Sequence, residues 1–191
     1  MTKAYDVSII VGRFQPFHKG HEALIEKALA LSDKLFLFVG HCGFTDTRHF
    51  IDVNIVKEMI LKHYENTQYH DRIEIIPLYD MADDSKWVLK LSMNINTLCV
   101  MHNIKNPNIC FVGCKKDVIW YVDLLPNWEL LMIPPYKGCT ATRIRKSYFC
   151  TGETLKDELP NISLDYLNQY KETDDYKKLS KVFKSFYSII D

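Results

Sequence analysis

Short apolar segments alternate with segments of helical periodicity, and this alternation limits the fold of the chain more than any other feature. Residues 5–11 (YDVSIIV) form an apolar run that ends at a glycine, as expected for a buried strand. Residues 20–32 place alanine and leucine at helical spacing, and a second apolar run follows at 35–40. Continuous apolar strands joined by helices predict a parallel sheet that is covered on both faces.

The same alternation continues through most of the chain and predicts an α/β, Rossmann-like fold. We expect a parallel sheet of about five strands with helices on both faces, plus helices at the C-terminus. Ligands of such sheets bind beyond the carboxyl ends of the strands, so a site is expected in the loops after Val11, Gly40, Leu78 and Val112. The remaining strands are predicted at 72–78, 108–113 and 129–133, and the remaining helices at 53–64, 86–102 and 117–124.

Beyond residue 160 the sequence has polar, aromatic-rich helical patterns and no further strand pattern. We expect residues 1–158 to form the main domain and residues 159–191 to form a C-terminal helical extension packed on it. One apolar face is predicted on the last helix, and packing of this face on the domain is the first interpretation. A homo-oligomer contact, or a contact with a missing domain, is the alternative. The face consists of Val182, Phe183, Phe186, Tyr187 and Ile190.

Charge and hydropathy exclude several classes of protein. The 24 basic and 24 acidic residues give zero net charge, whereas proteins that bind a nucleic-acid backbone usually have a basic excess. No segment approaches the roughly 18 apolar residues of a membrane span, and the first strand pattern leaves no room for a signal peptide. We therefore expect a cytoplasmic protein without membrane or nucleic-acid partners. Its six cysteines are expected to be free thiols, with Cys110 and Cys114 as buried side chains rather than a zinc site.

The segment from Gly12 to His21 (GRFQPFHKGH) lies between the first predicted strand and the first predicted helix. Main-chain N–H groups and the helix dipole favour an anion at such a helix start. Gly20 would let a phosphate approach the main chain, His18 and His21 would direct ring nitrogens at it, and Arg13 would add a planar cation. A helix cap or an adventitious metal contact is the alternative for the two histidines. The pattern as a whole favours a phosphate-binding site.

A second group of phosphate-binding side chains occurs late in the chain, at residues 139–145 (CTATRIR). Thr140 and Thr142 would supply hydroxyl groups at a helix N-terminus, and Arg145 would supply a cation one turn later. An ordinary helix cap is the alternative for this motif taken alone. Together, the two motifs favour a function that involves phosphate binding.

The first segment resembles the H-x-G-H signature of the nucleotidyltransferase superfamily, and its longer G-R-F-Q-P-F-H-x-G-H form resembles the nicotinamide-nucleotide adenylyltransferases. Residues 139–145 resemble that family's S-x-T-x-x-R motif, with threonine in place of serine. The resemblance implies a Rossmann-like nucleotidyltransferase fold and adenylyl transfer from ATP to nicotinamide mononucleotide, which forms NAD and pyrophosphate. Nicotinate mononucleotide remains open as the acceptor. The implied catalytic residues are His18, His21 and Arg145, and the implied ATP-binding residues are Gly12, Arg13, Phe14, Gly20, Lys115, Asp117, Thr140 and Thr142.

Other segments extend the resemblance over nearly the whole chain. Residues 83–87 (DDSKW) resemble the family's short acidic turn, which implies that Asp84 and Trp87 bind the mononucleotide and that Trp87 stacks on the pyridine ring. A core position is the alternative for Trp87. Arg48 resembles a mononucleotide-binding arginine in the loop after the second strand.

Residues 113–117 (GCKKD) resemble a branch in which the adenylyltransferase is fused to a C-terminal Nudix hydrolase. A helix start is the alternative interpretation of Lys115 and Asp117. The sequence lacks the Nudix box, so the chain is either a stand-alone relative or part of a bifunctional protein.

The resemblance implies ATP and a pyridine mononucleotide as the partners of the chain. Mg²⁺ is the expected cofactor, carried by the ATP phosphates, and no metal site made of protein ligands is expected, because Mg²⁺ retains water and phosphate ligands. Three other functions remain open. The first is adenylyl transfer to another phosphorylated acceptor, namely FMN or phosphopantetheine, and the second is sensing of NAD or ATP without turnover. The third is an inert half of a bifunctional enzyme that is active only with its Nudix partner.

Overall fold

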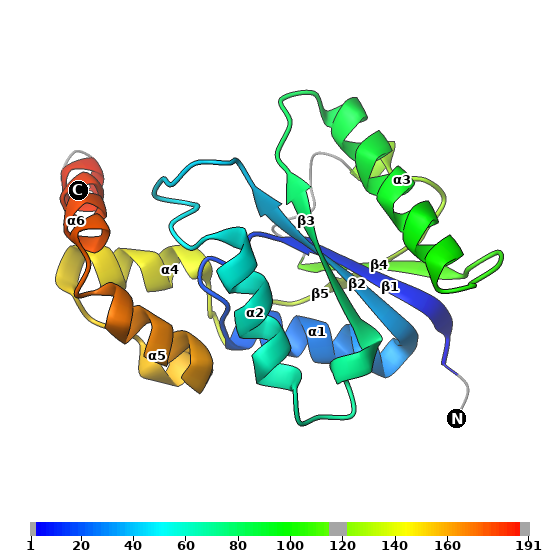
Figure 1. Cartoon of the computed structure of the whole chain (residues 1–191), viewed down its shortest axis with the longest axis horizontal. Coiled ribbons are helices and arrows are strands. Elements are labelled where there is room, and N and C mark those ends of the chain that lie inside the picture. Colours follow the sequence, from blue (N-terminus) through cyan, green and yellow to red (C-terminus); the bar gives the residue numbers. More distant parts are fainter. Residues whose placement is uncertain (1–2, 115–121, 188–191) are drawn as a thin grey trace.

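The computed structural model describes residues 3–114 and 122–187 and contains a five-stranded parallel sheet between helices (Figure 1). The strand order is β3-β2-β1-β4-β5, so β1 lies in the middle and the chain changes direction across the sheet between β1 and β4. This arrangement confirms the predicted Rossmann-like α/β fold and places a switch point at the carboxyl end of β1. The strands are β1 (Tyr5–Gly12), β2 (Ser32–His41), β3 (Ile73–Tyr79), β4 (Ile109–Cys114) and β5 (Glu129–Ile133).

Helices cover both faces of the sheet, and alternate strand residues supply two separate cores. Val7 and Ile9 of β1 belong to the core that contains α3, whereas Ile10 belongs to the core that contains α1 and α2. Figure 1 shows α1 and α2 on one side of the sheet and α3 on the other. Successive residues of β1 face opposite sides of the sheet, and both sides are covered by helices. The strand is therefore apolar without interruption over Ile9 and Ile10. The helices are α1 (Lys19–Leu31), α2 (Val53–Tyr64) and α3 (Asp84–Met101).

The C-terminal helices gather at one end of the molecule, beyond α2 (Figure 1). Leu159, Leu167 and Phe183 are buried in the same core as α1 and α2. The division into residues 1–158 and 159–191, like the homo-oligomer, stays a prediction. The elements are α4 (Ala141–Lys146), which continues into a π-helical segment (Ser147–Thr151), then α5 (Asn161–Tyr170) and α6 (Asp174–Tyr187).

The predicted apolar face of the last helix is wrong in part. Phe183 is buried at 5% exposure, but Val182 and Phe186 are 52% and 58% exposed. The first turn of α6 determines its rotation, because the Tyr176 hydroxyl donates to the carbonyl of Tyr148 at 2.9 Å. The residues that pack on the core then follow at spacings of three and four: Tyr176, Leu179, Phe183 and Tyr187. Ile190 lies outside the described residues.

Several element boundaries differ from the predicted ones for identifiable reasons. Helix α3 begins at Asp84 rather than at residue 86, because the Asp83 side chain caps it by accepting from the N–H of Lys86 at 3.0 Å. Strand β3 continues through Pro77 to Tyr79, and proline is tolerated there because β3 is an edge strand. Of the helix predicted at 117–124, residues 117–121 lie outside the described part, and Val122–Leu124 form one 3₁₀ turn.

In the described part of the chain no helix has the length and apolar character needed to cross a membrane. All six cysteines are free thiols, as predicted. Cys110 is fully buried, but Cys114 is only partly buried and faces the cavity described below, so the prediction that both are core side chains holds for Cys110 alone.

Candidate active site

A cavity of about 540 Å³ opens at the carboxyl ends of β1 and β4, at the predicted switch point. Both predicted phosphate-binding motifs contribute to it, although more than 100 residues separate Gln15 from Arg145 in sequence (separation 130). The cavity therefore brings together two motifs that lie far apart in the sequence and share only their phosphate-binding chemistry. Its predicted lining residues are Gly12, Arg13, Phe14, His18, Gly20, His21, Asp84, Trp87, Thr142 and Arg145.

The loop between β1 and α1 has an unusual backbone at Phe14, whose φ is 55°. The ring of Phe14 is 1% exposed and lies against Gly12, where an added Cβ would be 3.2 Å from it. On its other side the ring centroid is 4.5 Å from that of His21. Burial of the ring compensates for the left-handed conformation, which otherwise costs about 1–3 kcal/mol. The buried ring of Phe14 thus packs against the ring of His21 and helps to hold it in place.

His18 is the N-cap of α1, which starts one residue earlier than predicted. Its Nδ1 accepts hydrogen bonds from the N–H groups of Gly20 and His21, at 3.1 and 3.3 Å. Because Nδ1 acts as an acceptor, the neutral ring carries its proton on Nε2. The rings of His18 and His21 stack with centroids 3.7 Å apart, and both line the cavity. His18 therefore caps α1 while both histidine rings remain at the cavity, so the cap does not exclude phosphate binding by the pair.

The structure requires glycine at position 20 for a different reason from the predicted one. A Cβ at this position would lie 2.9 Å from Cε1 and 3.0 Å from Nδ1 of the His18 ring. Only glycine therefore lets the His18 ring fold back over the first turn of α1. Close approach of a phosphate to the Gly20 main chain stays a prediction.

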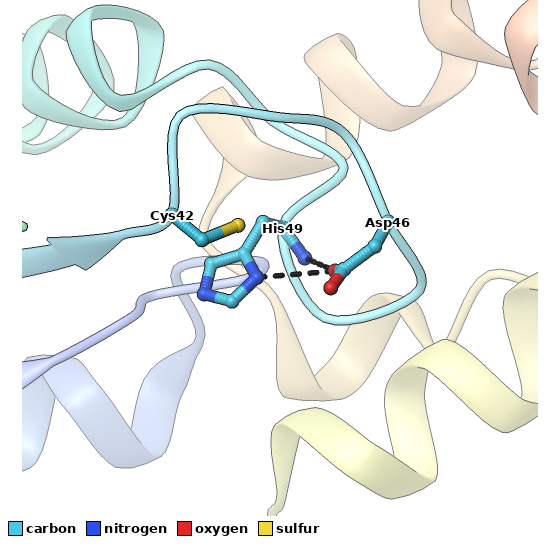
Figure 2. Close-up of side chains that lie close together, drawn as sticks. All are labelled: Cys42, Asp46 and His49. Carbon is cyan, nitrogen blue, oxygen red and sulfur yellow. Dashed lines mark hydrogen bonds and ion pairs between the residues drawn. The ribbon is translucent and has the colours of Figure 1, made fainter. Parts of the chain in front are cut away.

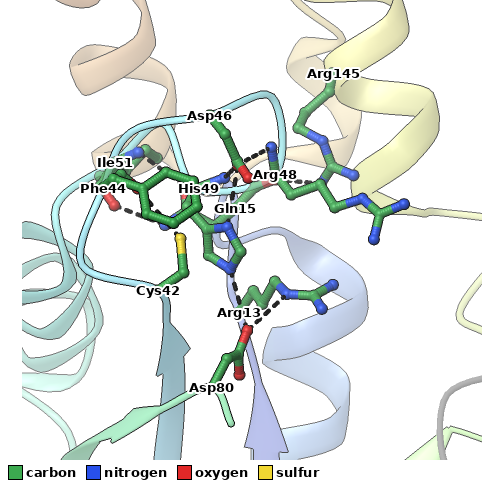
Figure 3. A network of polar contacts seen from close by, with 10 residues as sticks. All are labelled: Arg13, Gln15, Cys42, Phe44, Asp46, Arg48, His49, Ile51, Asp80 and Arg145. Atoms are coloured by element: carbon green, nitrogen blue, oxygen red, sulfur yellow. Dashed lines mark hydrogen bonds and ion pairs between the residues drawn. The ribbon is translucent and has the colours of Figure 1, made fainter. Parts of the chain in front are cut away.

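Three arginine side chains from separate segments lie near one another: Arg13, Arg48 and Arg145 (Figure 3). Arg13 and Arg145 line the cavity. Arg145 of α4 donates to the carbonyl of Gln15 at 2.7 Å, and a longer contact of 3.5 Å joins it to the Thr142 hydroxyl. Burial, together with the positive charges of Arg13 and Arg48, lowers the pKa of Arg145 to about 10. Like charges held together in this way favour a polyanionic ligand between them.

Gln15, which is not among the predicted site residues, joins the histidine loop to the loop after β2. Its side chain is 2% exposed, accepts from the N–H of Ile51 at 2.8 Å and donates to the Ile51 carbonyl at 2.6 Å. This two-way amide contact holds the loop that carries Arg48. A glutamine inside the motif is the only signal for it in the sequence.

Asp80 is a second missed residue, and it follows β3 at the edge where ligands were expected. One of its oxygens lies 3.8 Å from Nε of Arg13 and 3.4 Å from Nε2 of His49. Gly40 makes room for this contact, because a Cβ there would be 3.2 Å from the Asp80 carboxylate. Asp80 thus orients Arg13 at the cavity wall.

Two of the predicted mononucleotide-binding residues, Asp84 and Trp87, line the same cavity. Trp87 is 5% exposed, packs in the core beside Val88 and Leu91, and still lines the cavity, so its core role is present together with a surface available to a ligand. Asp84 is exposed at the start of α3 and also lines the cavity.

Arg48 and Thr140 are not among the residues that line the cavity. Arg48 is exposed on the loop after β2, and its positive charge is close enough to disfavour the charged form of Arg145. Thr140 caps α4, accepting from the N–H of Arg143 at 3.1 Å, while its neighbours Cys139 and Ala141 line the cavity. Lys115 and Asp117 lie outside the described residues.

Comparison with known proteins shows the family of the chain. Residues 9–147 match the model of the cytidylyltransferase-like family, and this range contains both phosphate-binding motifs. The chain belongs to the cytidylyltransferase-like family. One relative of similar length is the nicotinamide-nucleotide adenylyltransferase of Methanocorpusculum labreanum. It is 32% identical over 176 residues, which are 91% of this chain and 96% of the relative. The nicotinamide/nicotinic acid mononucleotide adenylyltransferase of Acinetobacter baylyi is 24% identical over 95% of both chains.

A solved structure shows how the cytidylyltransferase-like fold of this chain is used in a longer protein. The bifunctional NMN adenylyltransferase/ADP ribose pyrophosphatase of Francisella tularensis, complexed with AMP and a manganese ion, superposes with a TM-score of 0.81 at 27% identity. The match covers 93% of this chain and 52% of that one. The chain therefore spans about half the length of that bifunctional protein.

Proposed function

We propose that this protein is a nicotinamide-nucleotide adenylyltransferase, which transfers the AMP portion of ATP to nicotinamide mononucleotide and releases pyrophosphate. The names of the relatives support this reaction. The observation that carries the proposal is the convergence of His18, His21, Arg13 and Arg145 on one cavity at the carboxyl end of β1. A triphosphate is the ligand that such a concentration of cationic and hydrogen-bonding groups favours.

In the proposed reaction, a phosphate oxygen of the mononucleotide attacks the α-phosphorus of ATP. A new P–O bond forms, the bond between the α-phosphorus and the bridging oxygen breaks, and pyrophosphate leaves with that oxygen. The attacking phosphate is already ionised at neutral pH, so the protein needs neither a nucleophile nor a general base. Its contribution is to position the two reactants and to stabilise the charge that develops.

The cavity residues divide this work between them. The Nε2–H of His18 and the ring of His21 donate to the α- and β-phosphates, where negative charge increases in the transition state. Arg13 and Arg145 hold the β- and γ-phosphates from two sides, and Thr142 adds a hydroxyl. Arg145 is held ready by its hydrogen bond to the Gln15 carbonyl.

The mononucleotide is proposed to lie between β2 and α3. Arg48 contacts its phosphate, because it approaches the cluster from the loop after β2. Trp87 stacks on the pyridinium ring, whose positive charge favours an aromatic face. Asp84 lies beside Trp87 at the cavity wall and is available to a polar group of the acceptor.

Mg²⁺ is the divalent cation that we propose for the reaction. The carboxylates of the described cavity lining are Asp80 and Asp84, and Asp80 is already shared by Arg13 and His49. This donor set fits a cation that is carried by phosphate oxygens and water better than one held in a protein cage. When bound, the ion neutralises charge on the triphosphate.

The product of the reaction tests this proposal. Protein is incubated with Mg-ATP labelled at the α-phosphorus and with nicotinamide mononucleotide, and the products are separated by chromatography. Label in NAD supports adenylyl transfer. Label that stays in ATP, despite ATP binding, would support a nucleotide sensor, and label in FAD or dephospho-coenzyme A when the matching acceptor is supplied would indicate another adenylyltransferase.

A further inference from the structure

The loop between β2 and α2 gathers three side chains that can all ligate a transition metal (Figure 2). The ligand atoms of Cys42, Asp46 and His49 all lie within 4.8 Å of one another. No other group of three cysteine, histidine or acidic side chains in the described part of the chain is gathered so closely. This trio takes no part in the proposed chemistry of the nucleotide cavity.

Main-chain hydrogen bonds fold the loop around this trio. The Asp46 carboxylate accepts from the N–H groups of Arg48 and His49 at 2.6 and 2.7 Å, which turns the chain back toward Cys42. Both N–H groups donate to the same oxygen, Oδ1, so the second carboxylate oxygen of Asp46 takes no part in the turn and is available to a cation.

His49 is oriented as a metal-ligating histidine is. Its side chain is only 9% exposed, and its Nδ1 faces the Asp46 carboxylate at 3.1 Å. On the other side of the ring, Nε2 lies 3.4 Å from the Asp80 carboxylate. When the ring proton is on Nε2, toward Asp80, the lone pair of Nδ1 is available to a metal ion. Asp80 belongs to a different strand end, so this orientation does not arise from the loop alone.

We propose that Cys42, Asp46 and His49 bind one zinc-class divalent cation through a thiolate sulfur, a carboxylate oxygen and Nδ1, with water as the fourth ligand. Tetrahedral bonds of about 2.0–2.3 Å place neighbouring ligand atoms roughly 3.3–3.8 Å apart. The 3.1 Å separation of Nδ1 and the Asp46 oxygen is already close to that spacing. Sulfur and imidazole donors select zinc over magnesium, so this site is distinct from the ATP-borne cation.

Binding rearranges two existing contacts and releases a proton. The Cys42 thiol donates to the carbonyl of Phe44 at 3.3 Å, and it must lose that proton to become a thiolate ligand. In the metal-bound form the ring proton of His49 is on Nε2, and the 3.1 Å contact between Nδ1 and the Asp46 carboxylate is replaced by two bonds to the ion. The ion then fixes the loop that carries Arg48, whose other anchor is the contact between Gln15 and Ile51. We assign the ion a structural role in holding this loop.

Cobalt titration of the full chain, freed of metal and nucleotide, tests the site without relying on activity. We expect one equivalent of Co²⁺ to produce a thiolate-to-cobalt charge-transfer band together with visible bands of a tetrahedral ion, and Zn²⁺ to displace it. Cys42→Ser should lose the charge-transfer band, whereas Cys150→Ser, which changes another partly buried cysteine, should keep it. Asp46→Asn keeps an oxygen acceptor for the turn and should weaken Co²⁺ binding at least about tenfold.

Two results would overturn the proposal. One is the absence of stoichiometric Co²⁺ and Zn²⁺ binding by the wild-type chain, a measurement that needs no variant. The other is a thiolate band that survives in Cys42→Ser, which would place the ion on a different cysteine. Circular dichroism of the metal-free variants, compared with the metal-free wild type, verifies that a lost band reflects a lost ligand and not an unfolded chain.

Discussion

The guanidinium group of Arg145 donates a hydrogen bond to the main-chain carbonyl of Gln15 at 2.7 Å. This contact attaches the start of the C-terminal helical region to the loop between β1 and α1, and it holds a cation beside two others. The positive charges of Arg13 and Arg48 disfavour a charged Arg145 in the free protein. A bound triphosphate would relieve this repulsion, so the energy of the charge cluster favours ligand binding.

Replacement of Arg145 tests this interpretation. In Arg145→Gln we expect kcat/KM for ATP to fall by about 10²–10³-fold, since a partly buried charged contact to phosphate is lost. Arg143→Gln is the matched control, because Arg143 lies on the same helix and pairs with Glu158 outside the nucleotide cavity. Steady-state kinetics should show the control within about twofold of the wild type. Equal losses in the two variants would contradict the assignment to Arg145.

The two roles of His18 can be separated by substitution. His18→Ala removes the cap of α1 and should lower the free energy of unfolding by about 1 kcal/mol, in addition to reducing turnover. His18→Asn restores a capping oxygen and should recover the stability but not the turnover. Denaturant unfolding and kcat measured on the same preparations distinguish the roles. Recovery of both quantities in His18→Asn would show that the ring acts only as a cap.

His21 is expected to act in the transition state alone. Its replacement by alanine should lower kcat by about 10²–10³-fold with little change in the KM for ATP. A near-normal kcat would remove His21 from the catalytic residues.

The fold was largely predictable from the sequence because strands such as β1 are apolar on both faces and are separated by clear helical periods. The boundaries were less predictable, since they depend on side-chain caps such as that of Asp83 on Lys86. The buried face of α6 was not predictable, because a tertiary hydrogen bond between Tyr176 and Tyr148 determines its rotation. Periodicity alone does not distinguish Phe183 from Phe186.

That distinction leads to a stability prediction. Phe183 is 5% exposed and its ring stacks on Phe149 at 4.6 Å, so Phe183→Ala should lower the free energy of unfolding by about 3–5 kcal/mol. Phe186 is 58% exposed, and Phe186→Ala should change it by about 0.5 kcal/mol or less. Urea unfolding compares the two. Similar small effects of both changes would indicate that α6 does not pack on the main core.

Cys139 gives a prediction for alkaline pH. Burial raises the pKa of its thiol from 9.0 to about 11, so the folded chain holds this proton more tightly than the unfolded chain does. The corresponding stability is fully present below pH 9 and is lost as the pH rises toward 11, by at most about 2–3 kcal/mol. Urea unfolding between pH 8 and pH 11 should show a steeper decline for the wild type than for Cys139→Ala. Parallel declines would contradict a buried neutral thiol at this position.

The candidate site was predictable where a motif names the residue and less so where tertiary structure supplies it. His18, His21 and Arg145 were recognisable because they occur in motifs whose spacing is typical of phosphate-binding sites. Gln15 and Asp80 were not, because their partners lie on other loops and have no fixed spacing from them in the sequence. The trio of Cys42, Asp46 and His49 falls within eight residues, but its ligand atoms converge only through the turn at Asp46.

Pyrophosphate release tests the central claim most directly. Initial rates are measured with Mg-ATP and, in parallel, nicotinamide mononucleotide, nicotinate mononucleotide, FMN, phosphopantetheine or no acceptor. We expect release that depends on a pyridine mononucleotide, with the ratio of kcat/KM naming the preferred one, and background rates with FMN, phosphopantetheine and no acceptor. Background rates with both pyridine mononucleotides, from protein that binds ATP, would contradict the proposed function.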